Sequence, residues 1–268
     1  MSHYTDFLQT TLEGAANIAR TMFGKVSGTV KPDNPNQVLT DADLAIGKYI
    51  IGEITKHFPD HNIIDEETGV TDHGSRYTWV IDPVDGTSNF ANGVPEYGIM
   101  LGLLEDATPV AGGIALPAFS KLAIAEKGKG AFLNGERMHV LTNVPLSNCL
   151  VAYGVDSHKN NPGFTRKECA LIAEIILNVR SIRSTNSVYD AVLVAEGKYA
   201  AFLHRNSKIW DNVAQQVMIE EAGGLYTDFF GKPIDYSDPL QKTETVYTWC
   251  AAAPDIHRQL QEIIHANA

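Results

Sequence analysis

The chain has 268 residues, of which 44% are hydrophobic and 20% charged, so it can bury a sizeable core and is neither disordered nor fibrous. Lys and Arg number 21 against 32 Asp and Glu, and the formal net charge of -11 argues against nucleic acid or anionic membranes as partners. Three Cys without metal or redox spacing, and an N-terminus without an apolar leader segment, predict a reduced, cytoplasmic protein.

The first half of the chain is predicted to combine helices with a largely antiparallel sheet. Apolar residues recur at helical spacing over 6–23, residues 24–36 are rich in Gly, Pro and Asn and indicate a loop, and a second helix begins at Asp41 or Asp43. Five apolar segments predict strands: 62–64, 77–81, 97–104, 108–116 and 121–126. Asn134-Gly135 between apolar flanks predicts a hairpin.

The second half of the chain, from about Cys149, alternates strands and helices. Strands are expected at 150–153, 179–182 and 199–203, and helices at 171–177, 188–195, 211–222 and 255–265. This alternation is typical of a smaller α/β lobe. We therefore predict one domain spanning 1–268, with sub-lobes at about 1–147 and 148–268 that share an interface.

The most informative segment is 79–90, which reads W-V-I-D-P-V-D-G-T-S-N-F. An apolar strand leads to Asp82, Pro83 is expected to fix a turn before Asp85, and Gly86 lets the backbone approach a ligand closely. Two neighbouring carboxylates repel each other unless cations bridge them, and the N–H groups of the short helix that follows favour a phosphate. Metal ions and a phosphate together would satisfy both tendencies.

Two further acidic groups stand at the ends of predicted elements. Asp65-Glu66-Glu67 follows the strand at 62–64, and Asp211 follows Ile209-Trp210 at the start of a helix. Oxygen ligands without His or Cys favour Mg²⁺, Mn²⁺ or Ca²⁺ over zinc, and Mg²⁺ is the ion we predict. Each acidic group taken alone is more typical of a helix cap or a solvated turn than of a metal site.

Together these segments resemble the inositol monophosphatase family of lithium-sensitive, Mg²⁺-dependent phosphatases. Segment 79–90 is similar to its W-x-I-D-P-x-D-G-T-x-N-F motif, 65–67 to G-E-E, and 210–211 with 220–224 to W-D…E-A-G-G. Weaker similarities are 39–43 to V-T-x-A-D and 128–135 to G-x-G-A-F-x-N-G. The resemblance implies a layered α-β-α-β-α sandwich, of α+β or α/β character and shared with fructose-1,6-bisphosphatases, and it implies a homodimer.

The resemblance also implies a set of metal ligands. Glu66, Asp82 and the carbonyl of Val84 would hold one Mg²⁺. Asp82, Asp85 and Asp211 would hold a second, so that Asp82 bridges the two ions. A weaker third site can involve Glu66, and Mn²⁺ is a possible substitute. Water held between the ions would attack phosphorus in line.

The catalytic and phosphate-binding residues come from the same resemblance. Thr87, oriented by Asp43, is similar to the pair that positions or deprotonates the attacking water, and Glu66 counts as catalytic through the third metal; Asp43 is also a candidate helix cap. Gly86, Thr87 and Ser88 would bind the phosphate through their amides, beside Asp85. Glu67 is expected to support the metal ligands, and Lys31 is either a loop lysine that approaches the site or a solvated one.

The residues expected to contact the alcohol half of the substrate are Ser187, His204 and Arg205, and here the chain departs from the family pattern. Residues 185–188 read T-N-S-V where relatives commonly have G-S/T-A-A, and His204 stands where inositol-cleaving members carry a glutamate. His204 and Arg205 lie close in sequence to Arg183 and Lys208. This basic cluster could meet a second anionic group on the substrate, or it could equally be a solvated turn or a subunit contact.

The predicted function is the hydrolysis of a small phosphate ester of a sugar or polyol. Fructose-1,6-bisphosphatase, histidinol-phosphatase and a nucleotide phosphatase acting on NADP or 3′-phosphoadenosine 5′-phosphate are the alternatives within the same class. The alternative from a different class is a catalytically silent metal-binding scaffold. The intact acidic residues, with Thr87, argue against the scaffold.

Overall fold

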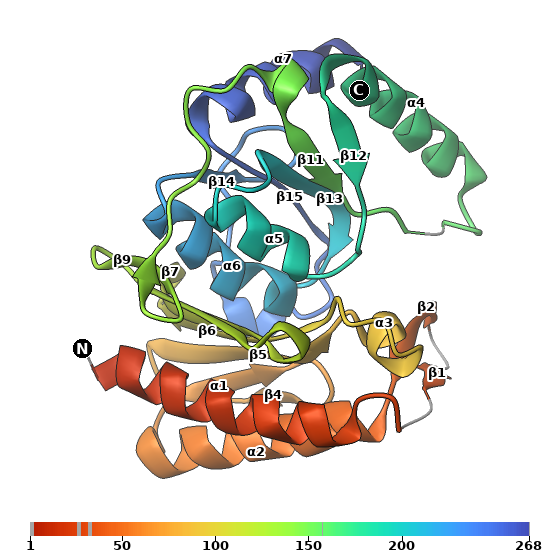
Figure 1. Ribbon diagram of the computed structural model, residues 1–268. Helices are drawn as coiled ribbons and strands as arrows, with labels where there is room; N and C mark the ends of the chain where they lie inside the picture. Colours follow the sequence, from red (N-terminus) through yellow and green to blue (C-terminus); the bar gives the residue numbers. More distant parts are fainter. Residues whose placement is uncertain (1–2, 26–27, 32–33, 157, 268) are drawn as a thin grey trace.

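The computed structural model describes residues 3–25, 28–31, 34–156 and 158–267. Its helices and two main sheets form five layers (Figure 1). Helices α1 (His3–Met22) and α2 (Asp41–His57) cover the outer face of the larger sheet, and α5 (Tyr189–Ala195) and α6 (Ile209–Glu221) lie between the sheets. Helices α4 (Pro162–Asn178) and α7 (Pro254–Asn267) cover the smaller sheet. The predicted α-β-α-β-α layering is therefore confirmed.

The larger sheet has eight strands in the order β10-β9-β8-β7-β6-β5-β3-β4. Only β3 and β5 pair in parallel, so the prediction of a largely antiparallel sheet is confirmed for the described residues. Its strands are β3 (Asn62–Asp65), β4 (Gly69–Thr71), β5 (Tyr77–Asp85), β6 (Gly98–Glu105), β7 (Thr108–Leu116), β8 (Lys121–Glu126), β9 (Gly130–Leu133) and β10 (Glu136–Arg137). The predicted hairpin at Asn134-Gly135 joins the last two.

The smaller sheet has five strands in the order β12-β11-β13-β15-β14. Strands β12, β11 and β13 are parallel, as the alternation of strands and helices predicted, whereas β15 is antiparallel to both of its neighbours. The bounds are β11 (Leu150–Tyr153), β12 (Ser181–Arg183), β13 (Ala201–Ser207), β14 (Leu225–Thr227) and β15 (Tyr247–Ala252). The sequence did not predict β14 or β15.

Two local predictions were wrong. Residues 24–36 are not all loop, because β1 (Thr29–Lys31) and β2 (Asn34–Leu39) pair as antiparallel strands despite the Pro and Asn content of this segment. Pro83 does not start a turn, because β5 continues to Asp85 with an irregular register against β6. Pro cannot donate to a ladder and is tolerated in a strand at such a bulge. The short helix α3 (Thr87–Ala91) then follows as predicted.

Helix α6 packs directly on the larger sheet through a glycine pair. Gly102 of β6 and Gly112 of β7 are cross-strand partners on the sheet face that α6 covers. A Cβ atom added at Gly112 would lie 2.8 Å from the Cα of Ala214, and one added at Gly102 would lie 2.6 Å from Val213. The missing side chains therefore let the helix approach the backbone of the sheet closely.

Three turns of 3-10 helix complete the described elements, and they span Pro117–Phe119, Leu146–Asn148 and Pro239–Gln241. On the outer face of the larger sheet, the core contains Leu8, Leu12, Ile46 and Ile50 from α1 and α2, and all four are fully buried. This apolar layer fixes β5 from behind, which positions the acidic residues at the end of that strand. Within the described part of the chain, every helix is too short or too polar to cross a membrane.

Candidate metal and phosphate site

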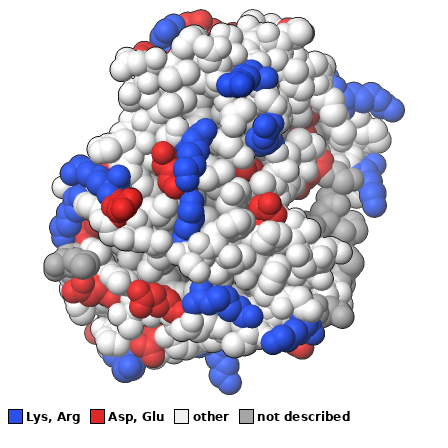
Figure 2. All heavy atoms as spheres, viewed as in Figure 1, with Lys and Arg blue, Asp and Glu red and all other residues white. Residues whose placement is uncertain are grey.

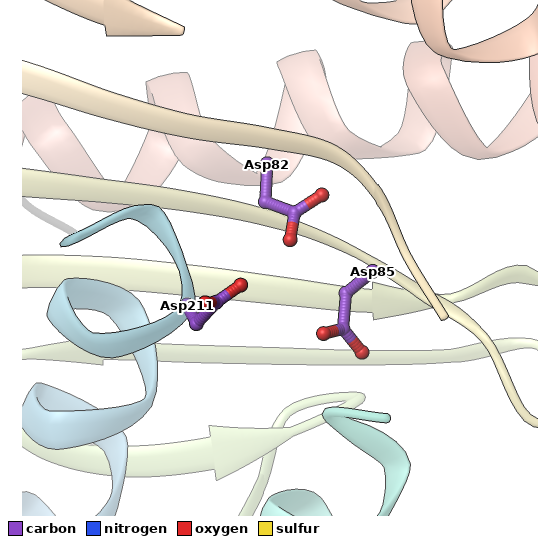
Figure 3. A group of neighbouring side chains, drawn as sticks. All are labelled: Asp82, Asp85 and Asp211. Carbon is purple, nitrogen blue, oxygen red and sulfur yellow. The ribbon is translucent and has the colours of Figure 1, made fainter. Parts of the chain in front are cut away.

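Three aspartate side chains converge between the larger sheet and helix α6. Asp82 and Asp85 come from β5, and Asp211 is the third residue of α6. Each offers a carboxylate oxygen, and these three oxygens lie within 4.8 Å of one another; Figure 3 shows the carboxylates turned toward one another. Residues three apart on a regular strand point to opposite faces, so the irregularity between Asp82 and Asp85 is what brings both to one side.

Burial and mutual repulsion govern the ionisation of this cluster. Burial, followed by repulsion from Glu66 and Asp85, raises the pKa of Asp82 well above its ordinary value. Burial also raises the pKa of Asp85, and the proximity of Asp211 adds to this rise. Burial raises the pKa of Asp211 as well, but the hydrogen bond from the backbone N–H of Lys208 opposes that rise. Bound cations would relieve the repulsion between these carboxylates.

The donor set fits a divalent metal ion. Among the described residues, the buried Oδ1 atom of Asp82 has no hydrogen-bond partner. A buried carboxylate oxygen without a partner is costly unless a cation binds it. The donors are hard oxygen atoms with no His or Cys among them, and such donors suit Mg²⁺ or Mn²⁺.

A cavity of about 230 Å³ opens at the aspartate cluster. Its lining includes ten of the residues singled out in the sequence: Glu66, Asp82, Val84, Asp85, Gly86, Thr87, Ser88, Ser187, His204 and Asp211. Glu66 follows β3 and Asp82 lies near the end of β5, and these two parallel strands end at the same edge of the sheet. Residues as far apart in the sequence as Glu66 and Asp211 therefore meet around one opening.

Thr87 joins the cavity to Asp43, which is buried and does not line it. The Thr87 hydroxyl lies 2.7 Å from the Val84 carbonyl oxygen and 3.2 Å from the Asp43 carboxylate. Asp43 also accepts bonds from the backbone N–H and hydroxyl of Thr40 in the capping box of α2. Burial raises the pKa of Asp43, and these hydrogen bonds oppose the rise only in part. Thr40 is therefore the N-cap of α2, whereas Asp43, three residues later, completes the capping box and orients Thr87.

Gly86 forms the turn between β5 and α3. Its φ of +80° lies in the left-handed region, which favours glycine. A Cβ atom there would lie 2.9 Å from the Cβ of Ser187 and 3.2 Å from the Glu96 carbonyl oxygen. Both the backbone conformation and the close approach of Ser187 therefore require glycine at this position.

The segment 185–188, where the sequence departs from the pattern of the family that it resembles, contacts the cluster directly. The backbone N–H of Val188 donates to the Asp85 carboxylate. The side-chain amide of Asn89 donates to the carbonyls of Glu96 and Thr185, at 2.7 and 2.8 Å. These bonds hold Ser187, which is buried, against Gly86 at the cavity wall.

The basic residues that are close in sequence do not gather in the cavity. The guanidinium of Arg205 packs on the rings of Phe164, Phe229 and Phe230, at 4.7, 4.9 and 5.8 Å, and Arg205 does not line the cavity. His204 and Arg205 are neighbours on β13, so their side chains point to opposite faces of the sheet.

The other basic side chains of the expected cluster already have partners. Lys208 lines the cavity, but its ammonium contacts the carbonyl and carboxylate of Glu244, at 2.8 and 3.3 Å. Arg183 is exposed, lies outside the cavity lining and donates to the Ser181 hydroxyl. On the face that Figure 2 shows, Lys and Arg are interspersed with Asp and Glu rather than gathered in one patch.

Of the two predicted supporting residues, Glu67 does not line the cavity. Glu67 follows Glu66 and is half-buried, and its backbone N–H donates to the Asp65 carboxylate at 3.3 Å. Lys31 ends β1, but its side chain lies outside the part of the chain that the structure describes.

Sequence reasoning missed Asp156 and Asn206, which both line the cavity. The Asp156 carboxylate lies 3.0 Å from the Nε2 atom of His204 and accepts a bond of the same length from the Asn206 amide. Asp156 follows β11, whose parallel pairing with β13 ends at Tyr153 and Leu203, so Asp156 lies beside the part of β13 that carries His204 and Asn206. That placement is the signal that could have found Asp156.

Residues 1–266 match the model of the inositol monophosphatase family. The chain is 32% identical over 253 residues to an Aquifex aeolicus protein named fructose-1,6-bisphosphatase/inositol-1-monophosphatase, which covers 92% of this chain and 93% of the relative. Two solved structures are similar over nearly their full length. An IMPase of Thermotoga maritima has a TM-score of 0.82 at 28% identity and full coverage of both chains. The extragenic suppressor protein suhB of Bartonella henselae has a TM-score of 0.87 at 27% identity, covering 98% of each chain.

The family and the names of its enzymatic relatives indicate a phosphatase. The acidic motifs around Glu66, Asp82 and Asp211 contribute residues to one cavity, and the five-layer fold is the fold of the similar structures. On this evidence the chain belongs to the inositol monophosphatase family.

Proposed function

We propose that this chain is a Mg²⁺-dependent phosphatase that hydrolyses a small phosphate monoester of a sugar or polyol. The observation that carries the proposal is the convergence of Asp82, Asp85 and Asp211 at a cavity that Thr87 also lines. An acidic cavity repels a phosphate unless cations are present, so this arrangement suits an anionic substrate only together with metal ions.

The metal ligands we propose are Glu66, Asp82, Val84 through its carbonyl, Asp85 and Asp211. Two or three ions of Mg²⁺, or of Mn²⁺ in its place, would fit this number of oxygen donors. When bound, they supply positive charge that neutralises the phosphoryl oxygens and lowers the pKa of water. The described carboxylates support this assignment because their burial and mutual repulsion disfavour a metal-free, fully ionised state.

Residues around the cluster would orient the attacking water and bind the phosphate. The Thr87 hydroxyl has one proton to give, to Asp43 or to the Val84 carbonyl, so its oxygen can accept a hydrogen bond from the attacking water. This contact would orient that water toward phosphorus. Gly86, Thr87 and Ser88 line the same cavity, and their backbone N–H groups would bind the phosphate oxygens.

A panel of esters tests the proposal. Phosphate release would be measured from inositol 1-phosphate, fructose 1,6-bisphosphate, histidinol phosphate, NADP and 3′-phosphoadenosine 5′-phosphate, each with Mg²⁺ and with EDTA. We expect release that requires Mg²⁺ and is lost in Asp82→Asn. Asp72→Asn, an exposed carboxylate outside the cavity, is the matched control and should keep full activity.

The rival function is a catalytically silent metal-binding scaffold. Some relatives carry names that do not describe an enzyme, such as the putative Nus factor SuhB of Neisseria meningitidis, 29% identical over 272 residues. A chain that binds Mg²⁺ but releases no phosphate from any ester of the panel would favour the scaffold. The homodimer and the cytoplasmic location stay predictions; sedimentation of the purified chain would test the first.

A further inference from the structure

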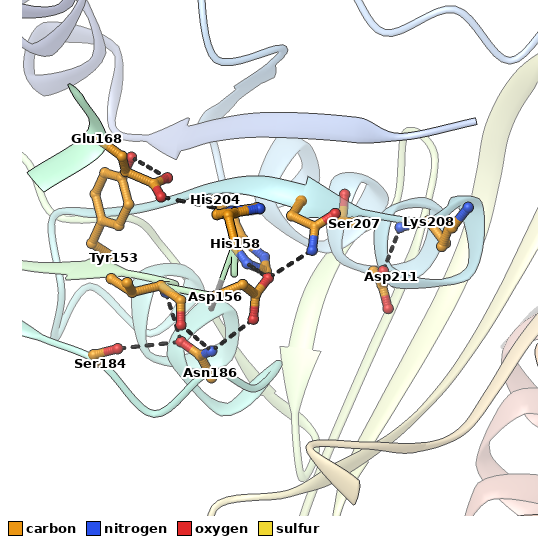
Figure 4. Close-up of polar contacts among 12 residues, drawn as sticks. Tyr153, Asp156, His158, Glu168, Ser184, Asn186, His204, Ser207, Lys208 and Asp211 are labelled. Atoms are coloured by element: carbon orange, nitrogen blue, oxygen red, sulfur yellow. Dashed lines mark hydrogen bonds and ion pairs between the residues drawn. The ribbon is translucent and has the colours of Figure 1, made fainter. Parts of the chain in front are cut away.

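A hydrogen-bonded group of side chains lies in the cavity apart from the aspartate cluster. Asp156 contacts His204 and Asn206, each at 3.0 Å, and the Asn186 amide reaches its other carboxylate oxygen at 3.3 Å. All four residues line the cavity. Figure 4 shows Asp156 between His204 and Asn186, with Asp211 farther along β13 and α6.

The position of His204 is built into the fold. A Cβ atom at Gly154 would lie 2.7 Å from the Cδ2 atom of the His204 ring, so the ring occupies space that only glycine leaves open. On its other side the ring meets Trp249, its cross-strand partner on β15, with 5.0 Å between centroids. His204 is therefore held in place with its Nε2 atom directed at Asp156.

Asn186 fixes the segment that carries Asp156. It adopts a positive φ of 53°, and its amide group exchanges hydrogen bonds with the backbone N–H and carbonyl of Val155, both at 2.8 Å. Asn186 and His204 thus both contact the carboxylate of Asp156.

The chemistry of this group is that of a hydrogen-bond acceptor. Burial alone would raise the pKa of Asp156, but the hydrogen bonds and charge of His204 and the bond from Asn206 lower it, so the carboxylate is ionised at neutral pH. A carboxylate has about four acceptor positions. The three bonds from His204, Asn206 and Asn186 leave room for one more donor from within the cavity.

The charges around Asp156 disfavour a second anionic group on the substrate. In the described part of the chain, the basic groups near Asp156 are His204, whose Nε2 atom already contacts its carboxylate, and His158, whose Nε2 atom lies 3.8 Å from the Glu168 carboxylate. The Lys208 ammonium contacts Glu244, and Arg205 lies on the other face of the sheet. A second phosphate at this place would meet a carboxylate in a cavity that is already acidic.

We propose that Asp156 is a specificity-determining residue: its carboxylate accepts a hydrogen bond from a hydroxyl of the substrate's alcohol half and repels a second phosphate. His204 is a positioning residue that acts through Asp156. This inference rests on the proposed phosphatase function and selects, within it, a monophosphate of an alcohol with several hydroxyl groups. This inference replaces the expectation from the sequence that a cluster of basic residues near His204 meets a second anionic group on the substrate.

The test compares three esters with Mg²⁺ in the full chain: inositol 1-phosphate, cyclohexyl phosphate, which has the same ring without its hydroxyls, and fructose 1,6-bisphosphate. Wild type should prefer inositol 1-phosphate over both. Asp156→Ala should lower the ratio of kcat/KM for inositol over cyclohexyl phosphate by about ten- to hundredfold, the usual range for a hydrogen bond to a charged group.

Two further variants test separately whether the charge of Asp156 repels a second phosphate and whether the position of His204 matters. Asp156→Asn keeps an acceptor oxygen but removes the charge, so it should raise kcat/KM for the bisphosphate relative to inositol 1-phosphate on the order of tenfold. Gly154→Ala should displace His204 and lower the inositol preference while Asp156 remains. The exposed control Asp72→Asn should leave all ratios unchanged.

The outcomes distinguish this inference from the proposed function. Hydrolysis with ratios that stay the same in both Asp156 variants would overturn the role of Asp156 and leave the phosphatase standing. A wild-type preference for cyclohexyl phosphate or for the bisphosphate would do the same. No Mg²⁺-dependent release from any of the three esters, or from the wider panel, would overturn the phosphatase and this inference with it.

Discussion

At the scale of single residues, two contacts fix the position of the Thr87 hydroxyl in the cavity. The hydroxyl contacts the Asp43 carboxylate and the Val84 carbonyl, and Asp43 is itself fixed by two bonds from Thr40. A hydroxyl whose proton is directed toward such acceptors presents its oxygen to a donor in the cavity. This geometry makes Thr87 the residue through which α2 influences the site.

Thr87→Val should therefore lower kcat by about 10²- to 10⁴-fold, the usual range for a group that assists proton transfer. Valine has nearly the shape of threonine, so the free energy of unfolding should fall by only about 1 kcal/mol. Steady-state phosphate release and urea unfolding would measure the two effects. Thr87→Ser keeps the hydroxyl and is the control; a Thr87→Val chain as active as wild type would remove Thr87 from the mechanism.

The sequence predicted the acidic residues and Thr87 because they belong to short motifs with fixed neighbours. It could not place Arg205, because residues adjacent on a strand face opposite ways and the sequence does not say which face lines the cavity. Asp156 was missed for another reason: its partner His204 lies 48 positions later in the chain. Contacts of this kind depend on the order of strands in the sheet.

At the scale of elements, close contacts at glycines decide where the acidic residues lie. The turn at Gly86 and the packing of α6 on β6 and β7 each bring two backbones nearer than a Cβ atom would allow. The sequence predicted these helices and strands but not their separation, and it predicted a turn at Pro83 where β5 has a bulge. Hydrophobic pattern and residue propensity predict single helices and strands. How closely two of them approach depends on how they pack against each other.

Gly86→Ala should cost at least about 1–2 kcal/mol of unfolding free energy, because alanine is strained at a φ of +80°, and its methyl group would meet Ser187. Because Ser187 lines the cavity, activity should fall as well. Gly93→Ala is the matched control: its φ is +72°, but no atom lies within 4 Å of the added methyl group. We expect a similar strain in that variant with activity retained. Equal loss of activity in both variants would contradict the account.

Gly112→Ala should push α6 away from the sheet, since its methyl group would lie 2.8 Å from the backbone of Ala214. Asp211 begins that helix, so Mg²⁺ affinity should weaken together with stability. Gly52→Ala, at an open position in α2, should instead stabilise the protein by up to about 1 kcal/mol. Thermal unfolding with and without Mg²⁺ would compare the two. If Mg²⁺ shifted the thermal unfolding of Gly112→Ala as much as that of wild type, the position of α6 would not determine Mg²⁺ binding.

At the scale of the whole molecule, the five layers place the aspartate cluster between the larger sheet and α6, where burial makes its charges costly. The family resemblance implied this layering, and the helical and strand periods of the sequence predicted many of its elements. They did not predict β14 and β15, which complete the smaller sheet. The division into sub-lobes near residue 147 stays a prediction, and α6, from the second half, packs on strands of the first.

The metal-free protein should lose stability as pH rises because of Asp82. Its pKa is raised on folding, so the folded chain holds this proton more tightly than the unfolded chain, and the free energy of unfolding falls from about pH 4 upward. Asp82→Asn removes this effect. In EDTA, the free energy of unfolding of Asp82→Asn minus that of wild type should increase with pH. The increase should be about 1.4 kcal/mol for each unit of pKa shift that is crossed. Urea unfolding at pH 4 and pH 7.5 would measure it, and a difference that stays constant or shrinks with pH would contradict the assigned burial.

The most direct test of the central claim is the calorimetric titration of Mg²⁺ into the metal-free chain at neutral pH. The account predicts that wild type binds at least one ion, and that Asp82→Asn and Asp211→Asn, which each remove one ligand charge, weaken binding by about tenfold or more. Asp72→Asn should bind as wild type does. Equal Mg²⁺ uptake by all four proteins, or none by wild type, would contradict the claim that these aspartates form a metal site.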